Sequence, residues 1–360
     1  MAYAKLSKND SAYIDLLRGI SIIRVVLVHL GLSWIFPPYS EVIHVFLPIL
    51  FFVSGAVSVF SFYRADSVTD YLLKRLISTS VPYFVVIFIS FSVIWILNKK
   101  IPEINYYIIY QWITFNPIAV PDTMPFPLGQ VWFLHVLVIL TLISPAFFIL
   151  AKKNTNLLII PILISLFFGS IQHYKNIGTE LFLDQHNFYQ TVSNMGFYFF
   201  GAYYYQNKEK FTNRVWLALI SSSIIIIICL IFFVNKSNSM SHHSYHPDLF
   251  YILSSFCIIF IFLCSKNAVE TVINKIILIK SILNFSSRHS FSIYLLHSLL
   301  VYWSEIYLGL IGVMNSPVLA TFKIIFVFLG TAILSIPTSF ITKKISRKIR
   351  YFLIEKRKLS

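Results

Sequence analysis

Ten apolar stretches separated by short polar segments constrain this sequence more than any other feature. They lie near residues 14–36, 43–62, 79–97, 131–151, 156–172, 189–206, 215–234, 247–265, 286–307 and 318–341. Most approach the roughly 20 residues that an α-helix needs to cross the hydrocarbon core of a bilayer. Only helices and closed barrels satisfy the backbone hydrogen bonds inside lipid. The sequence therefore predicts an all-α, polytopic integral membrane protein of about ten transmembrane helices, with residues 1–360 as one membrane-embedded domain.

The composition excludes a soluble protein of this length. Hydrophobic residues make up 57% of the chain and charged residues only 12%, whereas soluble domains carry roughly a quarter charged residues. The net charge of +15 invites a nucleic-acid interpretation, but the basic residues fall in the loops between apolar stretches. Topology signals and contact with anionic lipid explain such loop charges. We therefore expect a lipid bilayer as a partner and no nucleic acid.

The distribution of lysine and arginine predicts the orientation in the membrane. With the first segment on the cytoplasmic side, the outer loops contain only Lys99, Lys100, Lys175 and Lys236. Most other basic residues lie in the inner segments, as the positive-inside rule requires. The pattern predicts an even number of spans with both termini in the cytoplasm. It fits a multi-pass protein of a plasma membrane, such as the bacterial inner membrane.

The first apolar stretch carries ionisable residues that are costly in hydrocarbon and usually mark function. Arg18 and His29 are eleven residues apart, which places them on one face of a helix, separated by about 16 Å along its axis. A neutral imidazole can act as a base or a nucleophile near neutral pH. We predict catalytic roles for His29 and Arg18; a structural histidine and an arginine that snorkels to the headgroups are the alternatives. Arg24 lies deeper and needs an internal partner, for which Glu305 is a candidate.

Other polar residues stand at the ends of later spans. Lys74 and Arg75 precede the third span, where a basic pair is ordinarily a topology signal but also suits phosphate groups, as Arg18 does. Trp132, Tyr294 and His297 are candidates for substrate binding, with a packed core histidine as the alternative for His297. The outer loop between Asn98 and Gln130 holds aromatic residues and a proline-rich run, which suit either a sugar or an interfacial belt.

Metal and disulfide chemistry have little support in the sequence. His242, His243 and His246 cluster in an outer loop, but no acidic or thiol ligand accompanies them in a defined spacing. Cys229, Cys257 and Cys264 all lie in apolar stretches. We expect no metal and no permanently bound cofactor.

Five motifs in chain order give the sequence a family resemblance. They are Leu16-Leu17-Arg18-Gly19-Ile20 with Val28-His29, Phe51-Phe52-Val53-Ser54-Gly55, Lys74-Arg75 with Pro82, Val131-Trp132-Phe133-Leu134 with Pro145, and Ser290-Phe291-Ser292-Ile293-Tyr294-Leu295-Leu296-His297. In this order the chain resembles the acyltransferase-3 family of integral membrane O-acyltransferases. One departure concerns Ser78, because many members have a second arginine at that position. We also see no esterase domain of the SGNH type, which some members append.

The resemblance implies acyl transfer, usually of acetyl, from cytosolic acyl-CoA to a hydroxyl of an extracytoplasmic acceptor. Acetyl-CoA would then be a donor substrate held by Arg18, Lys74 and Arg75. The acceptor would be a cell-surface glycan, such as a polysaccharide or lipopolysaccharide, or its lipid-linked precursor. His29 would activate the hydroxyl as a base or carry the acyl group itself, and the sequence leaves both routes open.

Two other classes of function stay open at this point. Polysaccharide flippases and solute transporters also have many spans with arginine and histidine along a substrate path. A transporter needs no thioester and leaves its substrate chemically unchanged. A non-catalytic partner in a glycan-assembly complex would tolerate the loss of His29.

Overall fold

The structure is a computed structural model, and its described residues are mostly helical. It describes residues 6–30, 43–99, 104, 106–115, 129–175, 185–234, 240–245, 247–306, 308–310 and 316–355, in which no β-strand occurs. The α-helices are α1 (Lys8–His29), α3 (Pro48–Tyr63), α4 (Val68–Asn98), α5 (Tyr106–Thr114), α6 (Trp132–Lys153), α7 (Ile159–Lys175), α8 (Gln185–Gln206), α9 (Asn213–Val234), α10 (Met240–Tyr245), α11 (Leu249–Cys264), α12 (Lys266–Lys275), α13 (Ile277–Arg288), α14 (Ser290–Ile306) and α15 (Pro317–Arg350). Single turns of other helix types are η2 (Ile43–Phe46), η3 (Gly129–Val131), η4 (Thr155–Leu158), η5 (Lys208–Lys210) and η7 (Tyr351–Glu355).

A helix occupies each of the ten predicted spans. Six helical segments of the described chain are long and apolar enough to cross a membrane, and a seventh arises if α11 and α12, bent by 71°, count together. The helices α1, α8 and α14 fall outside this set. α14 has only 17 residues, while α1 and α8 carry many charged or amide side chains. The all-helical membrane architecture is thus confirmed, and the number ten stays a prediction.

Several helices begin at residues whose side chains cap them. Ser67 accepts a hydrogen bond from the backbone N–H of Asp70 at the start of α4, and Asp248 accepts one from Tyr251 at the start of α11. Ser316 caps α15, with Pro317 at its first position, where the missing N–H of proline costs nothing.

Residues 31–36 of the first predicted span and the proline-rich run at 117–127 lie outside the described residues.

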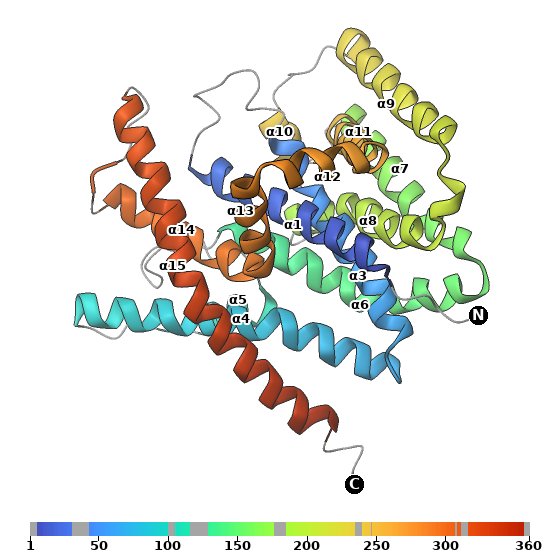
Figure 1. Ribbon diagram of the computed structural model, residues 1–360. Helices are drawn as coiled ribbons and strands as arrows, with labels where there is room; N and C mark the ends of the chain where they lie inside the picture. The colour runs from blue at the N-terminus through green and yellow to red at the C-terminus, as the bar shows by residue number, and fades with distance from the viewer. Residues whose placement is uncertain are drawn as a thin grey trace. The chain divides into compact units, whose positions relative to one another are not determined.

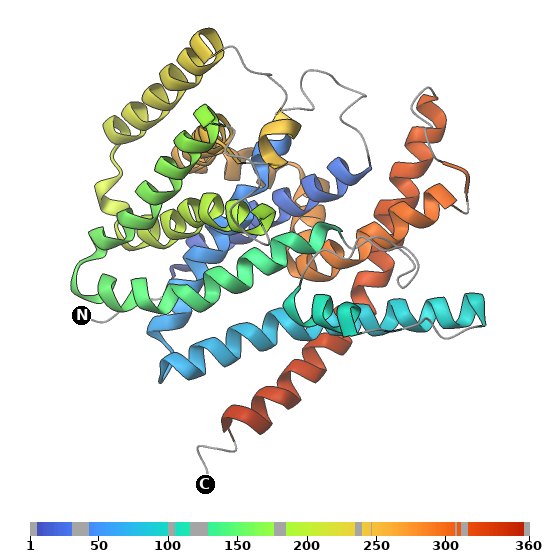
Figure 2. The same cartoon turned by 180° about the vertical axis from the view of Figure 1, so that it is seen from behind.

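The helices group into two compact units, each assembled from distant parts of the chain. The first unit comprises Met1–Arg24, Phe36–Ala65 and Leu142–Ser287, and the second comprises Val25–Ile35, Asp66–Thr141 and Arg288–Ser360. In the first unit, α3 packs along α8, α8 along α7, and α11 against α7 and α9. In the second unit, α15 packs against α14 and crosses α4, as Figure 1 and Figure 2 both show.

Glycine allows the closest helix crossing of the first unit. A Cβ atom added to Gly55 of α3 would overlap the backbone carbonyl of Tyr198 in α8, and one added to Gly201 of α8 would overlap that of Phe52. Small residues let helix backbones approach closely in membranes, where the hydrophobic effect does not drive helices together. The phenylalanine-rich Ser-Gly motif is therefore a packing element at the α3–α8 contact.

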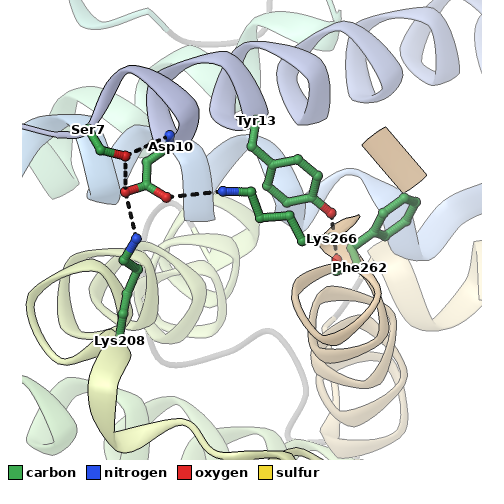
Figure 3. A network of polar contacts seen from close by, with 6 residues as sticks. All are labelled: Ser7, Asp10, Tyr13, Lys208, Phe262 and Lys266. Atoms are coloured by element: carbon green, nitrogen blue, oxygen red, sulfur yellow. Dashed lines mark hydrogen bonds and ion pairs between the residues drawn. The ribbon is translucent and has the colours of Figure 1, made fainter. Parts of the chain in front are cut away.

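A polar cluster ties the beginning of α1 to two other parts of the first unit (Figure 3). The buried carboxylate of Asp10 contacts Lys208 Nζ at 2.6 Å and Lys266 Nζ at 3.2 Å, and it accepts a hydrogen bond from Ser7 Oγ at 2.7 Å. Tyr13, one turn later, donates to the backbone carbonyl of Phe262. Burial opposes ionisation of Asp10, but Lys208, Ser7 and Lys266 outweigh it and hold its pKa below the usual value.

The α3–α8 crossing predicts that Gly55→Ala destabilises the protein. The new methyl group meets backbone rather than a movable side chain, so we expect a loss of at least about 1–3 kcal/mol in stability. Thermal unfolding of the purified protein in detergent measures this loss. Gly330→Ala is the control, because its Cβ would meet only the Cδ1 and Cγ atoms of the Leu300 side chain, which can adjust more easily than backbone. Equal stability of both variants would contradict the packing role.

The cluster around Asp10 predicts a pH-dependent contribution to stability. A carboxylate whose pKa is lowered by folding stabilises the folded state fully above its unfolded pKa of about 3.9, and this contribution is lost as the pH falls through the folded pKa. Asp10→Asn should therefore lower the unfolding temperature at pH 7, and the difference from wild type should shrink below about pH 4. Glu209→Gln, an exposed change beside Lys208, is the control. A difference that does not depend on pH would contradict this account.

Candidate active site

The candidate site in the second unit begins with the last turn of α1. α1 starts at Lys8 and ends at His29, so the histidine stands at a helix end. Its side chain is exposed, and its Nδ1 lies 2.8 Å from the backbone carbonyl oxygen of Val25. A carbonyl oxygen only accepts hydrogen bonds, so His29 Nδ1 carries the proton and donates it to Val25. In the neutral ring the lone pair is then on Nε2, the atom that can take up a further proton.

A second histidine from α14 contacts the first. His297 Nε2 lies 3.1 Å from His29 Nδ1, and the two ring centroids are 4.8 Å apart. His297 is completely buried, and its own Nδ1 is 3.1 Å from the carbonyl oxygen of Ile293. By the same argument His297 Nδ1 donates to that carbonyl, which leaves Nε2 as an acceptor facing the Nδ1–H of His29. The two backbone carbonyls therefore fix the tautomers, and the contact between the rings orients one against the other.

Polar residues of η3 and α14 extend this pair. Tyr294, one turn before His297, donates its hydroxyl hydrogen to the backbone carbonyl of Gln130. The amide of Gln130 donates to Ser298 Oγ at 2.5 Å. The Tyr294 ring also meets the Phe133 ring edge-on at 5.4 Å. These contacts hold the start of α6 against the helix that carries His297.

The predicted substrate-binding residues therefore divide. His297 and Tyr294 both belong to the polar group around His29. Trp132 is half-buried and its ring lies 6.4 Å from that of Phe133, its neighbour in the chain. Gln130 and Ser298 were not among the candidates from sequence. The position of Gln130 directly before an apolar span could have marked it as a candidate. Ser298 gave no such signal, because it is one of many serines in apolar helices.

The other predicted catalytic residue, Arg18, lies in the first unit. Its Nη1 forms an ion pair with Asp15 at 2.7 Å, one turn earlier on α1. The same Asp15 oxygen accepts a hydrogen bond from Ser287 Oγ at 3.3 Å. The guanidinium is thus held near the contact of α1 with α13, and its side chain is only 28% exposed.

The predicted donor residues Lys74 and Arg75 lie in the first turns of α4, in the second unit. Lys74 Nζ pairs with Asp70 Oδ2 at 2.7 Å along the same helix. The backbone carbonyl of Arg75 accepts hydrogen bonds from the hydroxyls of Ser78 at 2.7 Å and Thr79 at 3.0 Å. Lys74 therefore has a partner on its own helix, as expected for opposite charges four residues apart.

Three further ionisable groups in apolar helices, those of Arg24, Glu305 and Lys323, have structural partners. Arg24 donates to the backbone carbonyls of Ile43 at 2.6 Å and His44 at 3.0 Å, and Glu305 pairs instead with Lys323 at 2.7 Å. Glu305 is therefore not the partner predicted for Arg24. Permanently charged groups need such internal partners when they are buried.

The outer histidine cluster also has a structural role in part. His243 Nδ1 lies 2.8 Å from Asp248 Oδ2, and Asp248 caps α11 through its other oxygen. His246 lies outside the described residues. Within the described part of the chain, no group of three histidine, cysteine, aspartate or glutamate residues could hold a metal ion.

Comparisons with known proteins bear on the chemistry of this arrangement. Neither a search of curated proteins nor a search of solved structures found a match. A family model described as an acyltransferase domain matches residues 11–339, from the start of α1 into α15. This match includes both histidines, all five motifs and most of both units. The chain therefore belongs to the acyltransferase-3 family of membrane proteins.

Proposed function

We propose that this protein transfers an acyl group, acetyl in the first instance, from cytosolic acyl-CoA to a hydroxyl of a cell-surface glycan or of its lipid-linked precursor. The family supports acyltransferase chemistry in a membrane protein. The contact of 3.1 Å between His297 Nε2 and His29 Nδ1 carries the finer proposal. The contact of His29 Nδ1 with the carbonyl of Val25 leaves the lone pair on Nε2, where a base for a sugar hydroxyl needs it, and the contact with His297 orients the ring.

In the proposed reaction, His29 Nε2 takes the proton of the acceptor hydroxyl while the hydroxyl oxygen attacks the thioester carbonyl. The carbon–sulfur bond then breaks, and the thiolate leaves as free coenzyme A after taking up the proton from His29. The imidazolium formed in between is oriented by Val25 and His297. In the alternative route, His29 Nε2 attacks the thioester carbonyl, the carbon–sulfur bond breaks and the thiolate leaves. The acceptor hydroxyl then attacks the acyl group on Nε2, its proton goes to the thiolate, and the neutral imidazole is restored.

The competing proposal is a flippase or transporter that performs no acyl chemistry. Ionisable residues inside membrane helices also line transport paths, so the residues alone serve both classes. The family favours acyl transfer. Mass spectrometry of surface glycans from cells with and without the protein separates the two. Cells that lack an acyltransferase make glycans without the acyl group, whereas cells that lack a transporter make glycans of unchanged chemistry.

His29→Ala should lower acyl transfer by about 10²–10⁴-fold, the usual effect of losing one positioned acid–base group. His29→Gln should be nearly as damaging, since an amide forms hydrogen bonds but cannot take up a proton at neutral pH. The measurement is acylation of the native acceptor in membranes, normalised to inserted protein. His135→Asn is the control, because the amide can still donate to the carbonyl of Thr114 as His135 does. Near-normal activity of both His29 variants would contradict the proposal.

The predicted topology has both termini in the cytoplasm and α5 outside. In a background in which Cys229, Cys257 and Cys264 are replaced by serine, Tyr110→Cys should react with a membrane-impermeant maleimide in intact cells. Tyr110 is suited to this test because its side chain is 57% exposed. Glu209→Cys, in η5, should react only after the membrane is permeabilised. The reverse pattern would contradict the ten-span orientation, which rests on the loop charges.

A further inference from the structure

A cavity of about 450 Å³ lies within the second unit, where α4, α14 and α15 meet. α4 contributes Ser78 and Pro82, the junction of α13 and α14 contributes one wall, and the last turns of α15 contribute the other. This volume is in the range of small-molecule sites. None of the predicted donor residues lines the cavity, so its chemistry has to be considered separately.

The cavity is strongly basic. Among the described residues, its lining contains no acidic side chain and five basic ones, namely Arg288, His289, Lys343, Arg347 and Arg350. Several like charges around one cavity repel one another unless an anion joins them. Arginine in particular presents planar donors that match the oxygens of a phosphate.

Arg350 carries a buried donor that the described protein does not use. Its Nε has no accessible surface to speak of and no hydrogen-bond partner among the described residues. A buried donor without a partner is costly, and native structures rarely keep one without a reason. A turn of the Arg350 side chain towards a ligand oxygen in the adjacent cavity would give this donor a partner.

Hydroxyl groups give the cavity an ordered polar wall. Ser339 Oγ lies 2.9 Å from His289 Nδ1 and 2.8 Å from Ser292 Oγ, which joins α15 to the start of α14. The first residues of α14 belong to the same wall, since Ser290, Phe291 and Ser292 line the cavity. The N–H groups of a helix start have no partner within the helix and favour a negative ligand.

α14 connects this cavity to the histidine pair. Ser290 lines the cavity and His297 contacts His29. The two residues are seven positions apart, so they lie on nearly the same face of α14, about 10 Å apart along its axis. The pantetheine arm of coenzyme A is longer than this separation. A donor held by its phosphates in the cavity could therefore extend along α14 to the histidines.

We propose that this cavity is a phosphate-binding site for a ligand that arrives from the cytoplasm, and that Arg347 and Arg350 of α15 are its main donors. We assign the phosphates to the nucleotide end of acyl-CoA, and this assignment rests on the proposed function. The phosphate of an anionic lipid headgroup has the same chemistry, and the experiment below distinguishes the two sources.

The test measures binding to the purified full-length protein in detergent by isothermal titration calorimetry. The probes are coenzyme A, 3′,5′-adenosine bisphosphate (which has no pantetheine arm) and a short-chain phosphatidylglycerol. The variant is Arg347→Gln with Arg350→Gln. The matched control is Lys344→Gln with Lys348→Gln, which removes the same charge from the same end of α15 at positions that do not line the cavity.

We expect the cavity variant to bind coenzyme A and the bisphosphate at least about tenfold more weakly, as the loss of one charge-assisted hydrogen bond predicts. The control should stay within about twofold of wild type. Arg350→Lys, which keeps the charge but loses the planar fork, should lie between them. Unchanged thermal unfolding would show that the variants are folded.

Equal binding of both nucleotides to wild type and the cavity variant would overturn the site. Binding of phosphatidylglycerol alone, lost in the cavity variant, would overturn the assignment to acyl-CoA and identify a lipid headgroup site. Failure of the proposed function looks different, because these measurements need no turnover. A cavity that binds coenzyme A in a protein whose His29→Ala variant remains fully active would refute the role of His29 and leave the cavity assignment standing.

Discussion

The cost of a polar group inside hydrocarbon is the constraint on which the rest of this structure depends. Backbone groups meet it by forming helices, and side chains meet it by finding partners inside the protein. Arg24 uses two backbone carbonyls near η2, Lys323 uses Glu305, and His297 uses Ile293 and His29. Ile293 lies one turn before His297 on the same helix, but the other partners lie on other helices, so their contacts also fix how helices pack. The histidine pair belongs to this set, and it leaves a lone pair on His29 Nε2 for chemistry.

The sequence predicted the elements far better than their contacts. A helix lies over every predicted span because hydrophobic length and the absence of backbone partners in lipid leave no other choice. The partner predicted for Arg24 was wrong, because a backbone carbonyl such as that of Ile43 has no signature in the sequence. His29 and His297 were both candidates, but their positions are 268 residues apart in the chain. Only the packing of α14 in the second unit brings them within hydrogen-bonding distance.

The end of α15 shows a second limit of sequence reasoning. Its lysines and arginines resemble any cytoplasmic tail that orients a membrane protein. Which of them share a cavity depends on the face of α15 that meets α14 and α4. The hydrophobic pattern cannot identify this face, because the apolar stretch near residues 318–341 ends before these basic residues. Arg347 and Arg350 line the cavity, whereas Lys344 and Lys348 of the same turns do not. Ser78, at a position where the family resemblance leads one to expect arginine, lines the same cavity as these α15 arginines.

The register of α14 joins these observations into one argument. Its first turn carries Ser290 and Ser292, whose small side chains line the cavity. Two turns later, on the same face, His297 is buried and orients His29. A shift of one residue along α14 would rotate His297 by 100° and separate it from His29 while the cavity wall turned away as well. Tyr294 and Ser298, which bond to Gln130 through its carbonyl and its amide, resist such a shift. The anchoring of α14 by η3 therefore serves the proposed donor cavity and the proposed base together.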